Sequence, residues 1–145
     1  MIRHGQFRGY QRGAVAVEAA LILPSLLMIA AMTTGGWRLS EVRADAQSAA
    51  EVAARAGSVA STVGEGHVVG QRVAMTELAG TRCSDPAIII DSSALALPVG
   101  STGVTSARVR CTVRLSDLLV PGMTGALHDE STAQSTVDSH RERHV

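Results

Sequence analysis

Residues 14–36 read AVAVEAALILPSLLMIAAMTTGG, and this apolar stretch decides the fold. Glu18 is its only charged residue. As a helix, the stretch spans about 34 Å at about 1.5 Å per residue, which exceeds the bilayer's hydrocarbon thickness of about 30 Å. The sequence therefore predicts a transmembrane helix over residues 14–37.

The flanks of this stretch predict its orientation. Arg3, Arg8 and Arg12 precede it, and no acidic residue accompanies them. Such a basic flank stays in the cytoplasm under the positive-inside rule. We therefore expect residues 1–13 to form a basic cytoplasmic leader of a single-pass cell-membrane protein whose remainder is extracytoplasmic. Trp37 fits an aromatic anchor at the far membrane–water interface.

Two other interpretations of the apolar stretch stay open. It could be the buried helix of a soluble protein, although 145 residues leave little chain to surround it. It could also be a secretory signal peptide that is cleaved near Ala44-Asp45-Ala46. Three charged residues separate that pattern from the apolar run, and the run is longer than the usual core of about 7–15 residues.

The chain after the membrane first predicts helices. Apolar residues recur at steps of three and four from Leu39 to Val63, with polar residues between them. This pattern is typical of an amphipathic helix, so residues 38–63 should extend the membrane helix. Gly64 and Gly66 predict its end. A second, shorter helix is expected over residues 70–78, ending at Gly80.

Strand patterns follow. Residues 87–91 are short and β-branched, and residues 130–139 are a weaker candidate. Residues 104–115 alternate, with Val109 and Cys111 on one face and Arg108 and Arg110 on the other. The basic face could bind a partner's acids, but we favour a solvated sheet face.

These elements predict an α+β fold, in which a long N-terminal transmembrane helix continues into an amphipathic helix packed on a small antiparallel sheet. The expected extracytoplasmic α+β domain covers residues 64–140, and residues 141–145 form a tail. The chain's aromatic residues are Phe7, Tyr10 and Trp37, so none lies in this domain. Its core must consist of small aliphatic side chains and should be thin.

Cys83 and Cys111 are the two cysteines of the chain. Outside the cytoplasm a disulfide between them is the natural expectation. Two unrelated buried thiols remain an alternative. A zinc site is not expected, because neither cysteine belongs to a Cys-x-x-Cys pair.

Other chemistries have little support in the sequence. His140 and His144, with His128, could approach a metal, but their charged surroundings indicate a solvated tail. No Gly-x-Ser-x-Gly elbow, phosphate-binding loop or paired-acid motif is present. From residue 14 onward ten arginines face thirteen acidic residues, so no basic patch indicates nucleic-acid binding. We therefore expect neither an enzyme nor a cofactor.

The junction before the membrane helix carries a more specific pattern. Residues 12–24 read RGAVAVEAALILP: a basic residue, a glycine, a short apolar stretch, an acid, an apolar run and a proline. This pattern resembles the TadE-like family, the minor pilins or pseudopilins of tight-adherence (Flp-type) pilus systems. The resemblance is specific over about residues 12–37 and fades into a general helix-then-strand architecture beyond them.

The resemblance implies roles for individual residues. A prepilin peptidase would cut between Gly13 and Ala14, which makes Glu18 the fifth residue of the mature chain. Its carboxylate would then meet the new amino terminus of a neighbouring subunit during assembly. Prepilins of this class often carry an aromatic residue after the glutamate, where this chain has Ala19. An interfacial acid that stays hydrated is the alternative for Glu18, and Pro24 would kink the helix, mark its packing face or simply be tolerated.

The resemblance also implies partners. These are the membrane, the major Flp-type pilin, a second minor pilin or pseudopilin, the inner-membrane assembly platform and the prepilin peptidase. The chain would either enter the pilus or act only in its assembly. A secreted or periplasmic binding module, and an unprocessed single-pass envelope anchor unconnected to pili, are the alternatives.

Overall fold

The computed structural model describes residues 8–115 and 124–138, with side chains from residue 16 onward. It contains two α-helices, one short 3₁₀-helix and three strands within these ranges. In chain order they are α1 (Arg8–Ser58), α2 (Val63–Leu78), β1 (Ser84–Asp91), η1 (Ser93–Ala96), β2 (Gly103–Arg114) and β3 (Ala126–Val137). The predicted α+β fold with a long N-terminal helix and a small antiparallel sheet is confirmed.

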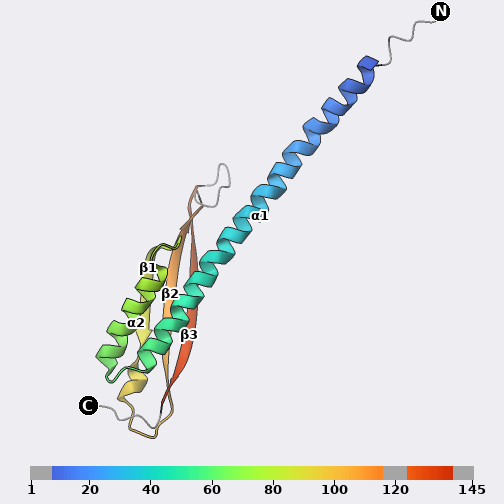
Figure 1. The fold of residues 1–145 in the computed structure, drawn as a ribbon. Coiled ribbons are helices and arrows are strands. Elements are labelled where there is room, and N and C mark those ends of the chain that lie inside the picture. Colours follow the sequence, from blue (N-terminus) through green and yellow to red (C-terminus); the bar gives the residue numbers. More distant parts are fainter. Residues whose placement is uncertain (1–7, 116–123, 139–145) are drawn as a thin grey trace, which may run out of the picture.

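The domain has two layers. The strands form an antiparallel sheet in the order β1-β2-β3, and α2 and the C-terminal half of α1 cover one face of it. The N-terminal half of α1 projects far beyond the sheet (Figure 1). The molecule is therefore a small two-layer domain at one end of a long helix.

The core between the layers is built from small side chains, as the sequence predicts. Its α1 contribution is a buried stripe consisting of Val42, Ala46, Ala49, Ala50, Ala53 and Ala54. The sheet contributes the buried residues Ala107, Val109, Cys111 and Val113 of β2 to the same core. Alanines bring the helix close to the strands but bury little area each, so the core is thin.

The helical extension ends earlier than the sequence analysis predicts. α1 stops at Ser58, and α2 begins at Val63, so the predicted end at Gly64 and Gly66 is wrong. Thr62 and Glu65 explain the difference. The Thr62 hydroxyl accepts a hydrogen bond from the Glu65 amide at 3.2 Å, and the Glu65 carboxylate accepts one from the Ser61 amide at 2.9 Å. These bonds satisfy the free amides of a new helix start and resemble a capping box.

The second helix is consequently longer than predicted, because it starts at Val63 instead of Gly70. Its predicted end is confirmed: α2 stops at Leu78, and Gly80 has the positive φ of 85° that glycine accommodates most easily. The third strand is also longer than predicted at its start, since it begins at Ala126. Ser139 and His140 of the expected domain and the expected tail, residues 141–145, lie outside the described residues, and η1 was not predicted.

Candidate functional site

The apolar half of α1 stands clear of the domain. Its large side chains are exposed, among them Leu21 at 73%, Leu27 at 69% and Met32 at 67%. A water-facing helix with this composition would be costly, at about 25 cal/mol for each Å² of apolar surface. The segment is long and apolar enough to cross a membrane and fits a single-pass anchor.

Hydroxyl groups inside this segment have partners within the helix. Ser25 donates to the carbonyl of Ile22, Thr33 to that of Ile29 and Thr34 to that of Ala30, each at 2.7 Å. In a hydrocarbon medium an unpaired hydroxyl costs several kcal/mol by transfer measurements. These backbone bonds make the polar side chains compatible with a lipid environment.

Glu18 is a polar side chain of the apolar segment that has no partner within the described helix. Its side chain is exposed, and no described residue hydrogen-bonds or ion-pairs with its carboxylate. A charged side chain in a membrane helix costs about 2.5–3.5 kcal/mol at the bilayer centre on insertion scales, and less near the interface. Glu18 therefore requires water or a partner outside the described residues.

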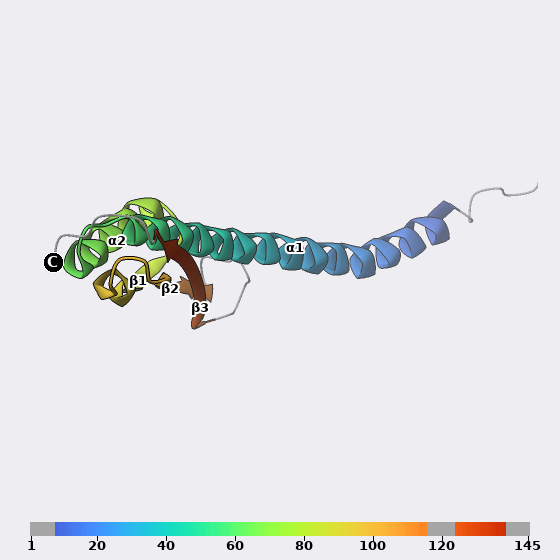
Figure 2. The same cartoon turned by 90° about the horizontal axis from the view of Figure 1, so that it is seen from below.

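The predicted processing bond lies within α1. Gly13 and Ala14 are part of the helix in the structure, which continues through them from Arg8. Pro24 also lies inside α1, and Figure 2 shows the helix curving in its blue, N-terminal part. A proline removes one helical hydrogen bond and pushes against the preceding turn, which bends a helix without ending it.

Trp37 lies where the apolar segment meets the domain. Its side chain is 70% exposed, whereas Val42, about 7–8 Å further along the helix, is fully buried in the core. An exposed indole next to the first core residue suits the interfacial position predicted for Trp37. The domain consequently begins immediately beyond the apolar segment.

Two ion pairs hold α1 at this junction. Glu41 accepts a hydrogen bond from Arg82, in the turn between α2 and β1, at 2.6 Å. Arg43 donates to Asp129 of β3 at 3.1 Å. Within one turn, the helix is thus tied to both edges of the sheet at the same end of the domain, and we call these four residues the junction clamp.

The sequence analysis did not identify the junction clamp. Its partners are separated by 41 and 86 residues in the chain, so no local spacing could pair them. The available signal was the alternation of charge directly after the apolar run, at Arg38, Glu41 and Arg43. Such a cluster indicates contacts with the domain, but it does not name the partner residues.

Cys83 and Cys111 form a disulfide, as expected for an extracytoplasmic domain. Cys111 is fully buried on the helix-facing side of β2, and Cys83 directly follows Arg82 of the junction clamp. The bond therefore attaches the turn that carries Arg82 to the central strand. It fixes one side of the junction clamp covalently to the core.

The outer face of the sheet carries the predicted basic stripe. Glu130 of β3 lies between two of its arginines, with contacts of 2.6 Å to Arg110 and 3.3 Å to Arg108. The hydrogen bond from Arg110, together with the charges of both arginines, lowers the pKa of Glu130 below its ordinary value. The stripe is thus partly neutralised within the sheet itself.

Of the three histidines that could approach a metal, the structure describes His128, which makes a local contact. His128 of β3 lies 3.2 Å from the hydroxyl of Thr112, its neighbour on β2. Within residues 8–115 and 124–138, no group of three potential ligands could hold a metal ion. His140 and His144 lie outside the described residues.

Comparison with known proteins agrees with the N-terminal pattern. The family model described as TadE-like protein matches residues 13–55. No curated protein and no solved structure matches the chain. The match covers the apolar segment and the whole buried stripe of α1, and it ends before α2 and the sheet. The resemblance to the TadE-like family is therefore confirmed for residues 13–55, the part of the chain that carries the family's segment.

Proposed function

We propose that this chain is a minor pilin or pseudopilin of a tight-adherence pilus system, anchored by α1 with its domain outside the cytoplasm. The TadE-like match supports a general role of this kind. The observation that carries the specific role is Glu18: an exposed carboxylate without a partner in the described chain, inside an otherwise uncharged apolar segment.

The proposed partner of Glu18 is an amino terminus. Cleavage between Gly13 and Ala14 would create a positively charged amine at the start of the apolar helix, and the family match itself begins at Gly13. In a low-dielectric medium an amine and a carboxylate attract strongly, while each charge alone is costly. An amine from one subunit and Glu18 of the next would therefore fix the axial register of two packed helices.

The domain has a separate part in this proposal. The buried stripe of α1 packs directly on the sheet, and the junction clamp adds two ion pairs where the apolar segment ends, so a shift of the helix would move the domain with it. Its partners would be the major pilin, a second minor pilin and the inner-membrane platform. We propose a structural role for the chain in assembly, not a catalytic one.

The first test is the mature N-terminus, measured by mass spectrometry of protein from membranes of its own host. A chain that begins at Ala14 supports prepilin processing. A chain that begins near Gln47 would be a secreted protein, and an intact chain would be an unprocessed anchor, so either result contradicts the proposal.

The second test addresses Glu18 directly. Glu18→Ala should abolish pilus production while the protein still inserts into the membrane. Glu18→Asp keeps the charge and serves as the matched control, with partial piliation expected. Normal piliation with Glu18→Ala would remove the assembly role from this residue.

A further inference from the structure

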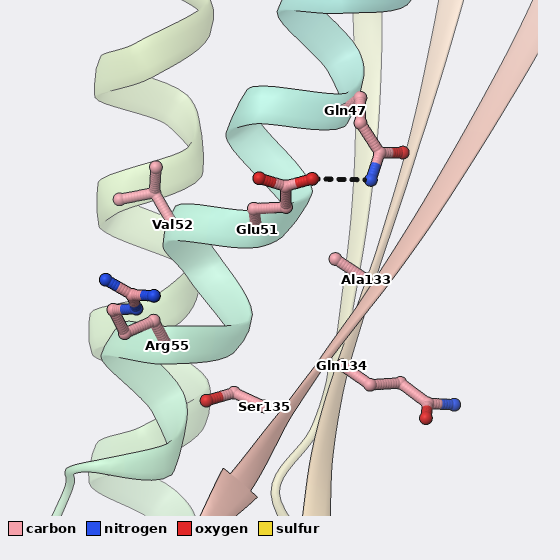
Figure 3. A pocket seen from close by; sticks show the side chains of 7 residues that line it. All are labelled: Gln47, Glu51, Val52, Arg55, Ala133, Gln134 and Ser135. Atoms are coloured by element: carbon pink, nitrogen blue, oxygen red, sulfur yellow. Dashed lines mark hydrogen bonds between the residues drawn. The ribbon is translucent and has the colours of Figure 1, made fainter.

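α1 and β3 lie side by side and run in the same direction. Arg43 contacts Asp129 near the start of their shared course, and Ser58 contacts Ser135 near its end. Between these contacts the helix advances about 22 Å at about 1.5 Å per residue, and the strand about 20 Å at about 3.4 Å per residue. Figure 3 shows the two elements following the same course along this stretch. A position on the strand therefore corresponds to a level on the helix.

This correspondence places the start of β3 at the level of Trp37. Ala126 precedes Asp129 by about 10 Å of strand, and Trp37 precedes Arg43 by about 9 Å of helix. Figure 1 shows this end of β2 and β3 farther along α1, toward its N-terminal half, than α2. The end of the two strands consequently lies where the apolar segment of α1 ends.

The residues at this end of the sheet close a hairpin. Arg114 pairs with Ala126, and the Leu115 amide donates to the Gly125 carbonyl at 3.0 Å. The Leu127 side chain is 41% exposed, and that of Leu115 is half-buried. We call these five residues the hairpin end. Apart from Arg114 it is apolar.

Burial along α1 continues past Trp37 into the apolar segment. On the side that packs on the domain, Val42 is preceded by Leu39, Gly35 and Ala31 at helical steps of three and four. Gly35 is buried, and Leu39 and Ala31 are half-buried, whereas Trp37 is 70% exposed. This covered side agrees with a hairpin end that lies beside the last turns of the apolar segment.

The charge at the hairpin end has no acid opposite it. Two arginines of the basic stripe share Glu130, but Arg114 is exposed and pairs in register with Ala126. The sequence that joins the two strands, SDLLVPGM at residues 116–123, adds one charge, that of Asp117. An arginine at the rim of an apolar patch suits the phosphate layer of a membrane, because its stem contacts apolar groups while its head binds phosphate.

We propose that the hairpin end is a second membrane contact, which lies in the lipid interface of the bilayer that α1 crosses. Leu115 and Leu127 contact the headgroup end of the acyl chains, and Arg114 binds lipid phosphate. The bilayer is the partner because α1 already brings it to this level: the apolar segment ends at Gly36, and the headgroup layer extends about 5–7 Å beyond the hydrocarbon.

A second contact has a mechanical consequence. A domain attached through one helix can tilt against the membrane, whereas two separate contacts fix its tilt. The inference needs the membrane anchor but not the pilus role, so it stands or fails separately from the proposed function.

Tryptophan fluorescence tests the proposal, because Trp37 is the one tryptophan of the chain. The full chain is reconstituted in vesicles of phosphatidylcholine and phosphatidylglycerol, with or without bromine near the headgroup end of the acyl chains, which quenches nearby indoles. In a Trp37→Phe background, Leu127→Trp should be quenched about as strongly as Trp37 is in the parent chain. Ala126→Trp repeats the measurement if Leu127→Trp disturbs the fold.

The matched control is Val104→Trp in the same background. Val104 is similarly exposed, at 46%, but it lies at the opposite end of β2, so this reporter should not be quenched. Both reporters carry the same preference of an indole for a membrane interface. The difference between them therefore measures the position of the hairpin end.

A charge reversal tests the role of Arg114. Arg114→Glu, added to the Leu127→Trp reporter, should reduce its quenching about twofold, because a basic residue beside an anionic surface contributes about 1 kcal/mol. Arg72→Glu is the control, since Arg72 is exposed on α2, away from the hairpin end, and should leave the quenching unchanged.

Three results would overturn the proposal. The first is a Leu127→Trp reporter that escapes quenching while Trp37 is quenched, since water or a second copy would then cover the hairpin end. The second is equal quenching of the Val104→Trp reporter, since the whole domain would then lie on the lipid surface. The third is the absence of quenching at both Trp37 and Leu127→Trp, since neither would then lie in the interface.

Discussion

Gly66 of α2 faces the carbonyl oxygen of Gly57 in α1 so closely that a Cβ at residue 66 would lie 3.0 Å from that oxygen. The same Cβ would also lie 3.0 Å from side-chain atoms of Leu95 and Ser92. The two helices therefore cross where an added Cβ would be crowded: on Gly57 it would lie 3.0 Å from the Thr105 Cγ2 atom and 3.4 Å from the Gly66 carbonyl oxygen. This contact allows α1 and α2 to approach closely within the helical layer.

Gly66→Ala should destabilise the domain by about 1–3 kcal/mol, because a methyl group at this position overpacks a contact formed partly by backbone. Urea unfolding of the detergent-solubilised full chain, followed by circular dichroism, measures the change. The matched control is Gly64→Ala in the same helix, where an added Cβ meets nothing within 4 Å. It should stabilise by about 0.4–1 kcal/mol through helix propensity and reduced chain entropy. Equal effects of the two variants would contradict the close crossing.

Thr105→Val should stabilise the domain. The Thr105 side chain is fully buried, and its hydroxyl has no hydrogen-bond partner among the described residues. Valine keeps the shape and removes a polar group whose unpaired burial costs about 1–3 kcal/mol, so a gain of about 1 kcal/mol is expected in the same unfolding experiment. Thr105→Ser keeps the hydroxyl and removes a buried methyl, and should instead cost about 1 kcal/mol. A loss of stability in the valine variant would mean that the hydroxyl has a partner.

Removal of the disulfide should have a larger effect. Cys83 and Cys111 are 28 residues apart, and closing a loop of this length stabilises a fold by about 3–4 kcal/mol in the chain-entropy model. A Cys83→Ala/Cys111→Ala variant should lose that amount, a large share for a domain with so thin a core. A reducing agent should lower the urea midpoint of the parent chain and leave that of the double variant unchanged. A parent chain that is insensitive to complete reduction would show that the bond contributes little.

The pKa of Glu130 gives a prediction for pH dependence. The Arg110 hydrogen bond and the nearby charges lower this pKa below 4.5 in the folded state. The contribution of Glu130 to stability is therefore fully present above its unfolded pKa and is lost as the pH falls through the folded pKa. Because the carboxylate is exposed, the effect on stability is small, and NMR titration of the Glu130 side chain is the suitable measurement. Arg110→Gln should raise the measured pKa toward its ordinary value, whereas an unchanged pKa would assign the shift to another cause.

Local patterns predicted most of the secondary structure correctly. The alternation around Val109 and Cys111 identified β2, because a strand with one buried face must alternate. The helix boundaries were less accurate. Gly64 and Gly66 suggested a helix end, since glycine often terminates helices, but here they lie inside α2. Their role depends on the neighbouring helix, which a local pattern does not describe.

The sequence by itself determined the long apolar N-terminal helix, the TadE-like segment, the small-residue core and the cysteine pair. These features depend on composition and on short-range spacing, which the chain displays directly. Only the tertiary structure decided the junction clamp and the crossing of α1 and α2 at Gly57 and Gly66. The clamp joins residues 41 and 86 positions apart, and the crossing depends on how two separate helices pack, so neither can be predicted from local spacing.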